Sequence, residues 1–188
     1  MANQKTIGFD LDGVIVDHSS TRIKLAKKFG FDLKPEQTPS EVIKHIIPKE
    51  VNNKIKALMY DDPELSQISP LMLGVVRTLD QVKETMPYFL ISRRRSSGRA
   101  IELLQRHELW PKYFNEENAF FVIEPEEKNE MAVKLNVTHY IDDEQGILEK
   151  LTDVENKFLF DNFNCFPDTD LYKRIKSWLE FEDSVLQF

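Results

Sequence analysis

The segment that most constrains the fold is IGFDLDGVIVD, residues 7–17, in which an apolar run ends abruptly in Asp10, Asp12 and Gly13. The run is typical of a buried strand. A buried carboxylate is costly unless a cation, a proton or a hydrogen-bond donor accompanies it. We therefore expect the rest of the chain to supply a partner for these two carboxylates.

Short β-branched or aromatic runs along the chain predict five strands. They are KTIGFD (5–10), YFLIS (88–92), AFFVIE (119–124), VTHYID (137–142) and KFLFD (157–161). Helix-like segments separate the later runs, at 96–109, 125–136 and 143–154. Strands that alternate with helices indicate a parallel sheet covered on both faces, an α/β fold.

The interval between the first and second predicted strands is too long for a structureless loop. Helical patterns occupy 19–30, 40–60 and 69–86, with Pro48 interrupting the second. The last of these has the spacing of a helix that packs on a sheet. We predict an α/β core domain from residues 1–17 and 69–188, and a small helical cap subdomain at 18–68, inserted after the first strand.

Charge and cysteine content limit the classes of partner and the setting. A net charge of −7 and a pI near 5.2 argue against a surface that binds polymeric nucleic acid. The single Cys165 cannot form an intramolecular disulfide, which favours a reducing interior. Polar residues begin at Asn3, and no apolar run approaches a membrane span. We therefore expect a cytoplasmic protein without a membrane anchor.

Polar residues gather where three of the predicted strands end. Asp10 and Asp12 follow the first strand, Ser92 and Arg93–Arg95 the second, and Asp142 and Asp143 the fourth. In parallel α/β sheets, ligands bind beyond the carboxyl ends of the strands. Acidic side chains that converge there repel one another unless a cation is bound, and Mg²⁺, which prefers oxygen ligands and substrate phosphates, fits best.

The motifs DLDGVIVD, LIS, a following lysine and YIDD occur in the order found in the haloacid dehalogenase (HAD) superfamily, which this chain resembles. The resemblance implies a Rossmann-like, five-stranded parallel sheet in the order 5-4-1-2-3 with a helical cap. It also implies that Asp10 is the nucleophile that accepts a phosphoryl group. Asp12 would protonate the leaving oxygen and then activate water. A carboxylate at this second position implies phosphoryl transfer rather than dehalogenation.

The same resemblance implies roles for the other strand-end residues. Ser92 would donate its hydroxyl to the phosphoryl oxygen. Asp142 would complete the Mg²⁺ site with Asp10 and the main-chain carbonyl of Asp12, and Asp143 would bind through water or orient a neighbour. Taken singly, these aspartates also suit plainer roles, because Asp12 with Gly13 can form a turn and Asp142 with Asp143 can cap a helix.

Two lysines compete for the remaining motif. Pro125 suits a helix start, which places Lys128 in the first turn near the active edge, and Lys134 lies about 9 Å further along at ~1.5 Å per residue. We choose Lys128, whose charge would offset that of the phosphoryl group, although a solvated lysine among glutamates would look similar.

The segment SRRRSSGR, residues 92–99, carries four arginines, and we expect Arg93 and Arg94 to contact substrate. A solvated loop is the plainer alternative. The four histidines show no paired ligand spacing, so packing or surface roles are expected for them.

The predicted function is Mg²⁺-dependent hydrolysis of a small phosphorylated metabolite through an aspartyl-phosphate. ISRR (91–94) and LFDNFNC (159–165) resemble nucleotidase segments and favour nucleoside monophosphates, with sugar phosphates as the alternative. A non-catalytic binding protein of the same fold is the rival from another class. A phosphoryl-accepting signalling receiver fits poorly, because the third predicted strand ends in IEPEE and offers no accepting aspartate.

Overall fold

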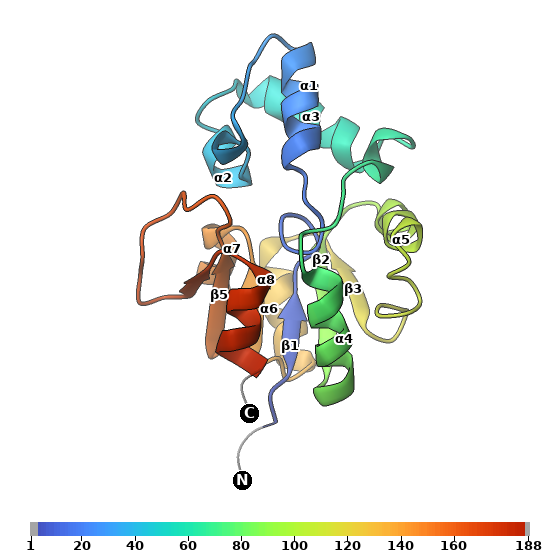
Figure 1. Cartoon of the computed structure of the whole chain (residues 1–188), viewed down its shortest axis with the longest axis vertical. Helices are drawn as coiled ribbons and strands as arrows, with labels where there is room; N and C mark the ends of the chain where they lie inside the picture. Colours follow the sequence, from blue (N-terminus) through green and yellow to red (C-terminus); the bar gives the residue numbers. More distant parts are fainter. Residues whose placement is uncertain (1–3, 187–188) are drawn as a thin grey trace.

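The structure is a computed structural model that describes residues 4–186. The outermost residues of the predicted core domain, 1–3 and 187–188, lie outside the described residues. A sheet with flanking helices forms one end of the molecule. A second group of helices lies beyond the carboxyl ends of its strands (Figure 1).

The sheet has six parallel strands in the order β3-β2-β1-β4-β5-β6. The strands are β1 (Ile7–Phe9), β2 (Tyr88–Arg93), β3 (Ala119–Val122), β4 (His139–Asp142), β5 (Asn156–Phe160) and β6 (Lys173–Ile175). The predicted α/β fold is confirmed, and the first five strands have the predicted order. The predicted count of five is wrong, because β6 pairs with β5 and extends the sheet by one strand.

Helices cover both faces of the sheet. One face packs against α4 (Val75–Thr85), α5 (Ser97–Arg106) and α8 (Trp178–Phe181), which continues into a π-helical turn, η3 (Glu182–Leu186). The other face packs against α6 (Pro125–Lys134) and α7 (Gln145–Lys150). Alternate strand residues enter the two hydrophobic clusters, because successive side chains of a strand point to opposite faces. Phe158 and Phe160, for example, join the first cluster, whereas Leu159 joins the second.

The helices beyond the sheet have a hydrophobic cluster of their own. They are α1 (Ser19–Lys28), η1 (Pro35–Gln37), α2 (Ser40–Ile43), α3 (Lys49–Tyr60) and η2 (Leu65–Gln67). The buried residues of the cluster are Leu25, Ala26, Leu33, Ile43, Ile47, Ile55 and Met59. Pro48 lies just before α3, where its lack of an N–H does not break the helix. The division of the chain at 18 and 68 stays a prediction.

Two segments connect the helical group to the sheet, and they run beside each other. Val16 forms an antiparallel bridge with Leu71, the amide of Asp17 donates to the Pro70 carbonyl at 2.8 Å, and that of Met72 donates to Ile15 at 2.8 Å. The first segment also folds back on itself, since the amide of Gly13 donates to Val16 at 2.9 Å. These contacts fix the loop that carries Asp12.

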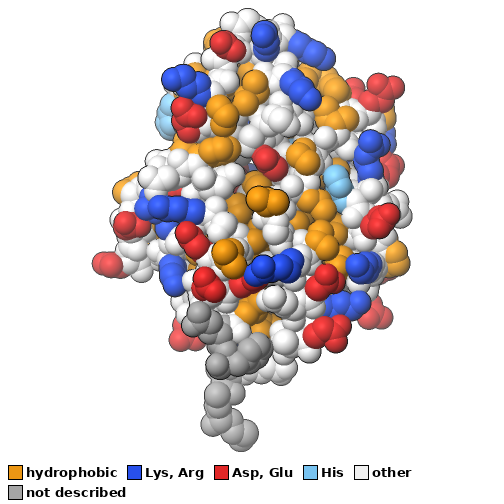
Figure 2. Space-filling view, viewed as in Figure 1, with side chains coloured by type: hydrophobic (Ala, Val, Ile, Leu, Met, Phe, Trp, Pro, Cys, Tyr) orange, Lys and Arg blue, Asp and Glu red, His pale blue; other side chains and the backbone are white. Residues whose placement is uncertain are grey.

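The surface on the side of α4 and α8 mixes acidic and basic side chains, with apolar side chains gathered between them (Figure 2). None of the helices within residues 4–186 has the length and apolar character to cross a bilayer.

Candidate active site

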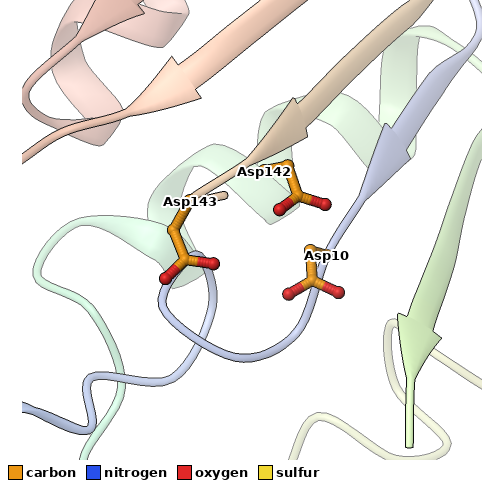
Figure 3. Close-up of side chains that lie close together, drawn as sticks. All are labelled: Asp10, Asp142 and Asp143. Carbon is orange, nitrogen blue, oxygen red and sulfur yellow. The ribbon is translucent and has the colours of Figure 1, made fainter. Parts of the chain in front are cut away.

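Three carboxylates converge at the carboxyl ends of two neighbouring strands (Figure 3). Asp10 directly follows β1, and Asp142 and Asp143 lie at the end of β4, which pairs with β1. One oxygen from each of the three lies within 4.8 Å of the others. The parallel register, with Phe9 opposite Ile141, therefore brings together residues more than a hundred positions apart in sequence.

Lys128 bridges two of these carboxylates. Its side chain is 2% exposed, and its Nζ donates to Asp10 Oδ1 and to Asp142 Oδ2, both at 2.7 Å. The start of α6 places it there, because Glu127 Oε2 accepts the amides of Ile123 and Glu124 and fixes the first turn. The alternative lysine, Lys134, lies exposed at the other end of this helix.

The acidic cluster has more carboxyl groups than its single lysine could neutralise. Burial and the neighbouring carboxylates raise the pKa of Asp142 to about 7 despite Lys128. Burial likewise raises the pKa of Asp10, which Lys128 opposes. Burial and the adjacent Glu144 and Asp142 raise the pKa of Asp143 well above its ordinary value. If all three are ionised, the cluster with Lys128 has a net charge of about −2, which suits a divalent cation.

The chemistry of these donors fits Mg²⁺. They are carboxylate oxygens on a rigid sheet edge, the ligand type this ion prefers. The loop leaves room for them, because a Cβ on Gly13 would lie 2.2 Å from Asp143 Oδ2. Asp142 also has a plainer structural role, since its Oδ1 accepts the amide of Glu144 at 3.0 Å.

Alanine in place of Gly13 is expected to disturb this cluster. Gly13 has a φ of +84°, which disfavours a side chain, and the added methyl would displace the Asp143 carboxylate. We expect a loss of about 1–3 kcal/mol in the free energy of unfolding and weaker Mg²⁺ binding, measured by denaturant unfolding and calorimetry. Gly30→Ala is the matched control, because Gly30 also has a positive φ but no neighbour within 4 Å of its Cβ position. Equal Mg²⁺ affinity in both variants would contradict the role given to this loop.

The Asp12 carboxylate lies outside the three-carboxylate cluster and faces a second set of partners. Arg94 donates to it twice, from Nε at 2.7 Å and from Nη2 at 2.5 Å, and His18 Nε2 lies 2.6 Å away. Burial would raise the pKa of Asp12, but Arg94 and His18 hold it well below its usual range. The Asp12 carboxylate is therefore already engaged by protein partners, and the metal contact expected from its main-chain carbonyl stays a prediction. Arg94 contacts Asp12 in this structure, where we expected it to contact substrate.

Sequence reasoning missed His18, for which we expected a packing or surface role. Burial and the nearby Arg94 lower its pKa, despite Asp12, so the imidazole is neutral. Because the ionised Asp12 only accepts, His18 Nε2 must donate, and Nδ1 then accepts from the Ser69 hydroxyl at 2.8 Å. Thr21 Oγ1 lies 2.9 Å from the same hydroxyl. The two connecting segments thus jointly orient Asp12 through His18.

Ser92 is fully buried at the carboxyl end of β2. Its Oγ has no hydrogen-bond partner within residues 4–186. Burying such a hydroxyl costs about 1–3 kcal/mol, so its persistence is consistent with a ligand that accepts from it. Ser92 itself does not line the cavities described next, so its predicted contact with a phosphoryl oxygen stays a prediction.

Two adjoining cavities lie between the sheet edge and the helical group. The smaller, about 60 Å³, is bordered by Asp10, Lys128, Asp142 and Asp143. The larger, about 580 Å³, extends toward the start of α6. Lys56, Tyr60 and Arg93 border both. The geometry therefore provides a compact acidic centre with space for a larger group beside it.

Comparisons with known proteins give structural matches only. No protein-family model matches the sequence, and no curated protein matches it either. A conserved haloacid dehalogenase-like protein of unknown function from Agrobacterium tumefaciens has a TM-score of 0.69 at 16% identity, with 98% of each chain covered. A HAD family hydrolase from Deinococcus radiodurans, solved with bound phosphate and sodium, has a TM-score of 0.65 at 14% identity, covering 98% of this chain and 96% of that one.

A third solved structure, of a predicted phosphatase from Clostridium acetobutylicum, has a TM-score of 0.62 at 13% identity and covers 98% of this chain and 99% of that one. All three matches span both the sheet and the helical group, because they cover nearly the whole chain. The resemblance expected from the motifs is thus confirmed at the level of the fold. The chain has the fold of the haloacid dehalogenase superfamily hydrolases.

Proposed function

We propose that the protein is a Mg²⁺-dependent phosphomonoester hydrolase that works through an aspartyl-phosphate on Asp10. The observation that carries this proposal is the position of the Asp10 carboxylate. It shares the buried Lys128 with Asp142, at 2.7 Å to each, and lies with Asp142 and Asp143 in one oxygen cluster at the sheet edge. The structure from Deinococcus radiodurans, which holds phosphate and sodium, is in keeping with a phosphoryl site in this fold.

The contacts of Asp10 suit a nucleophile. Its Oδ1 accepts from Lys128 and its Oδ2 from the amide of Asp12 at 3.1 Å, so the carboxylate has a fixed orientation. In the first step an Asp10 oxygen forms a bond to phosphorus and the ester oxygen leaves. The Lys128 ammonium offsets the negative charge of the phosphoryl group. Mg²⁺ held by Asp10, Asp142 and Asp143 would supply further charge neutralisation at the phosphoryl oxygens.

Asp12 is proposed as the acid and base of the two steps. It would give a proton to the leaving alkoxide and then take one from the water that attacks the aspartyl-phosphate. In the described conformation Arg94 and His18 hold Asp12 ionised, which suits the base. To act as the acid, Asp12 must gain a proton and give up at least part of its contact with Arg94.

The helical group, residues 18–68, is proposed as a cap that excludes water and selects the substrate. It contacts the catalytic edge directly, because Glu41 of α2 accepts the amides of Gln145 at 2.9 Å and Gly146 at 3.3 Å, just after Asp142 and Asp143. Nucleoside monophosphates and sugar phosphates are the two substrate classes that the sequence suggests, and the larger cavity has room for either.

A panel of phosphorylated metabolites assayed with Mg²⁺ and with EDTA tests this function. We expect phosphate release from at least one small monoester with Mg²⁺, and a loss of at least about a hundredfold with EDTA, because the cation completes the site. Restoring Mg²⁺ should restore the rate. Phosphate release that EDTA leaves unchanged would contradict the metal site. No release from any substrate would favour the non-catalytic binding protein.

A further inference from the structure

The larger cavity beside the acidic centre has a positive lining. Its basic residues are Lys56 of α3, Arg93 at the end of β2, and Arg94 and Arg95, which follow β2. Its acidic residues are Asp61 and Glu124. The lining thus carries four basic side chains against two acidic ones, although Arg94 is paired with Asp12 and Arg93 approaches Glu144 at 3.4 Å. In a chain with a net charge of −7, this local excess of positive charge is a distinct feature.

The three remaining basic groups have few partners of their own. Within residues 4–186, Lys56 and Arg95 form no ion pair, and Arg93 has one contact, to Glu144 at 3.4 Å. Lys56 is partly buried. Burial lowers its pKa, and the nearby Arg22 and Arg93 add to this effect, whereas Glu144 and Asp143 oppose it. An anion in the cavity would give Lys56 and Arg95 a partner of opposite charge.

The cavity lies where a leaving group would extend. Lys56 and Arg93 border both this space and the smaller cavity that contains Asp10 and Lys128. A phosphoryl group seated against Asp10 and Lys128 would fill the smaller cavity, which has only about 60 Å³. The rest of the substrate must then enter the larger one, which has about 580 Å³.

We propose that the substrate carries a second anionic group, a carboxylate or a phosphate, on the part released as the alcohol, and that Lys56, Arg93 and Arg95 bind this group. The proposal rests on the proposed hydrolase function, which places the reacting phosphoryl group at Asp10. Arginine suits either anion, because its planar guanidinium donates two parallel hydrogen bonds to carboxylate or phosphate oxygens. Since Lys56 belongs to the cap and the two arginines to the core, the second anion would also hold these parts together.

Matched substrate pairs test the proposal. Glycerol 3-phosphate is compared with 3-phosphoglycerate, which has a carboxylate in place of the terminal CH2OH group. Fructose 6-phosphate is compared with fructose 1,6-bisphosphate, which carries a second phosphate. In at least one pair, we expect kcat/KM to be at least about tenfold higher for the compound with the second anionic group. This is the effect of one or two added charge-assisted hydrogen bonds. The pair that shows the larger ratio identifies the anion.

Variants locate the effect. Lys56→Gln and Arg95→Gln should each reduce the ratio within that pair by about tenfold. Lys54→Gln is the matched control, because Lys54 is an exposed lysine of the same helix that does not line the cavity, and it should keep the wild-type ratio. Hydrolysis of both members of both pairs at equal kcat/KM would overturn the second anion site while leaving the hydrolase function intact.

Binding to the Asp10→Asn variant separates the two proposals. Calorimetry should show that the compound with the second anionic group binds more tightly than its partner in the pair. Adding Lys56→Gln should reduce this difference in affinity. If wild-type protein hydrolyses none of these esters but the difference in affinity persists, the hydrolase function fails and the anion site stands. Equal affinities for both members of each pair would overturn the anion site.

Discussion

Asn in place of Asp10 is expected to lower kcat by about 10⁴-fold or more while the protein stays folded. An amide cannot supply the anionic oxygen that attacks phosphorus, and loss of a nucleophile removes this much rate in other covalent enzymes. Stability should change little, because burial already raises the pKa of Asp10 and so disfavours its charge, and Lys128 keeps its 2.7 Å contact with Asp142. Steady-state kinetics with Mg²⁺ and thermal unfolding measure the two effects.

Asp170→Asn is the control for this substitution, because Asp170 is exposed and lies outside the acidic cluster. It should keep wild-type kinetics and stability. Mg²⁺-dependent turnover that survives in Asp10→Asn would contradict the assignment of the nucleophile. Loss of turnover together with loss of the folded state would instead show that Asp10 acts through stability.

Met in place of Lys128 is expected to destabilise the protein by about 3–5 kcal/mol near neutral pH. The ammonium is the buried cation between Asp10 and Asp142, and removing one partner of a buried pair leaves uncompensated charge. The measurement is urea unfolding of wild type and variant. Lys134→Met is the matched control on the same helix, and its exposed position predicts a change within about 0.5 kcal/mol.

The destabilisation by Lys128→Met should depend on pH. The pKa of Asp142 is about 7 in the folded protein and 3.8 in a model compound, so between these values the folded state binds more protons than the unfolded state. Stability therefore falls as pH rises through this window, and the loss of Lys128 extends the fall to higher pH by raising the pKa of Asp142 further. We expect the deficit to shrink toward pH 4 and Mg²⁺ to recover part of it at pH 7. A deficit independent of pH would contradict this account of the cluster.

The first five strands could be predicted because each is an apolar run followed by polar residues, and their order in the sheet followed from the resemblance of the motifs to those of the HAD superfamily. β6 could not. It has three residues, Lys173–Ile175, two of them basic, and it gains its place only by pairing with β5 at the sheet edge. A strand this short has no periodic pattern to detect, since its existence depends on a tertiary contact.

The strand-end carboxylates and Lys128 could be located from sequence because parallel strands end at one edge and Pro125 marks a helix start. The side-chain contacts of Asp12 could not be predicted from the sequence. His18 joins Asp12 to Ser69, 51 residues further along the chain, and Arg94 reaches Asp12 across 82 residues. No local pattern encodes such pairs. The buried carboxylates thus have protein partners, Lys128 for Asp10 and Arg94 with His18 for Asp12, beside the divalent cation that we propose for the cluster.

The central claim is that Asp10, Asp142 and Asp143 hold a divalent cation beside the carboxylate that accepts the phosphoryl group. A crystal structure with Mn²⁺, which gives an anomalous signal, and beryllium trifluoride, which mimics a phosphoryl group, tests it directly. The account predicts an anomalous peak within bonding distance of oxygens of Asp10 and Asp142, with Asp143 bound to the ion directly or through water, and beryllium bonded to an oxygen of Asp10. A cation bound elsewhere, or an adduct on a residue other than Asp10, would contradict it.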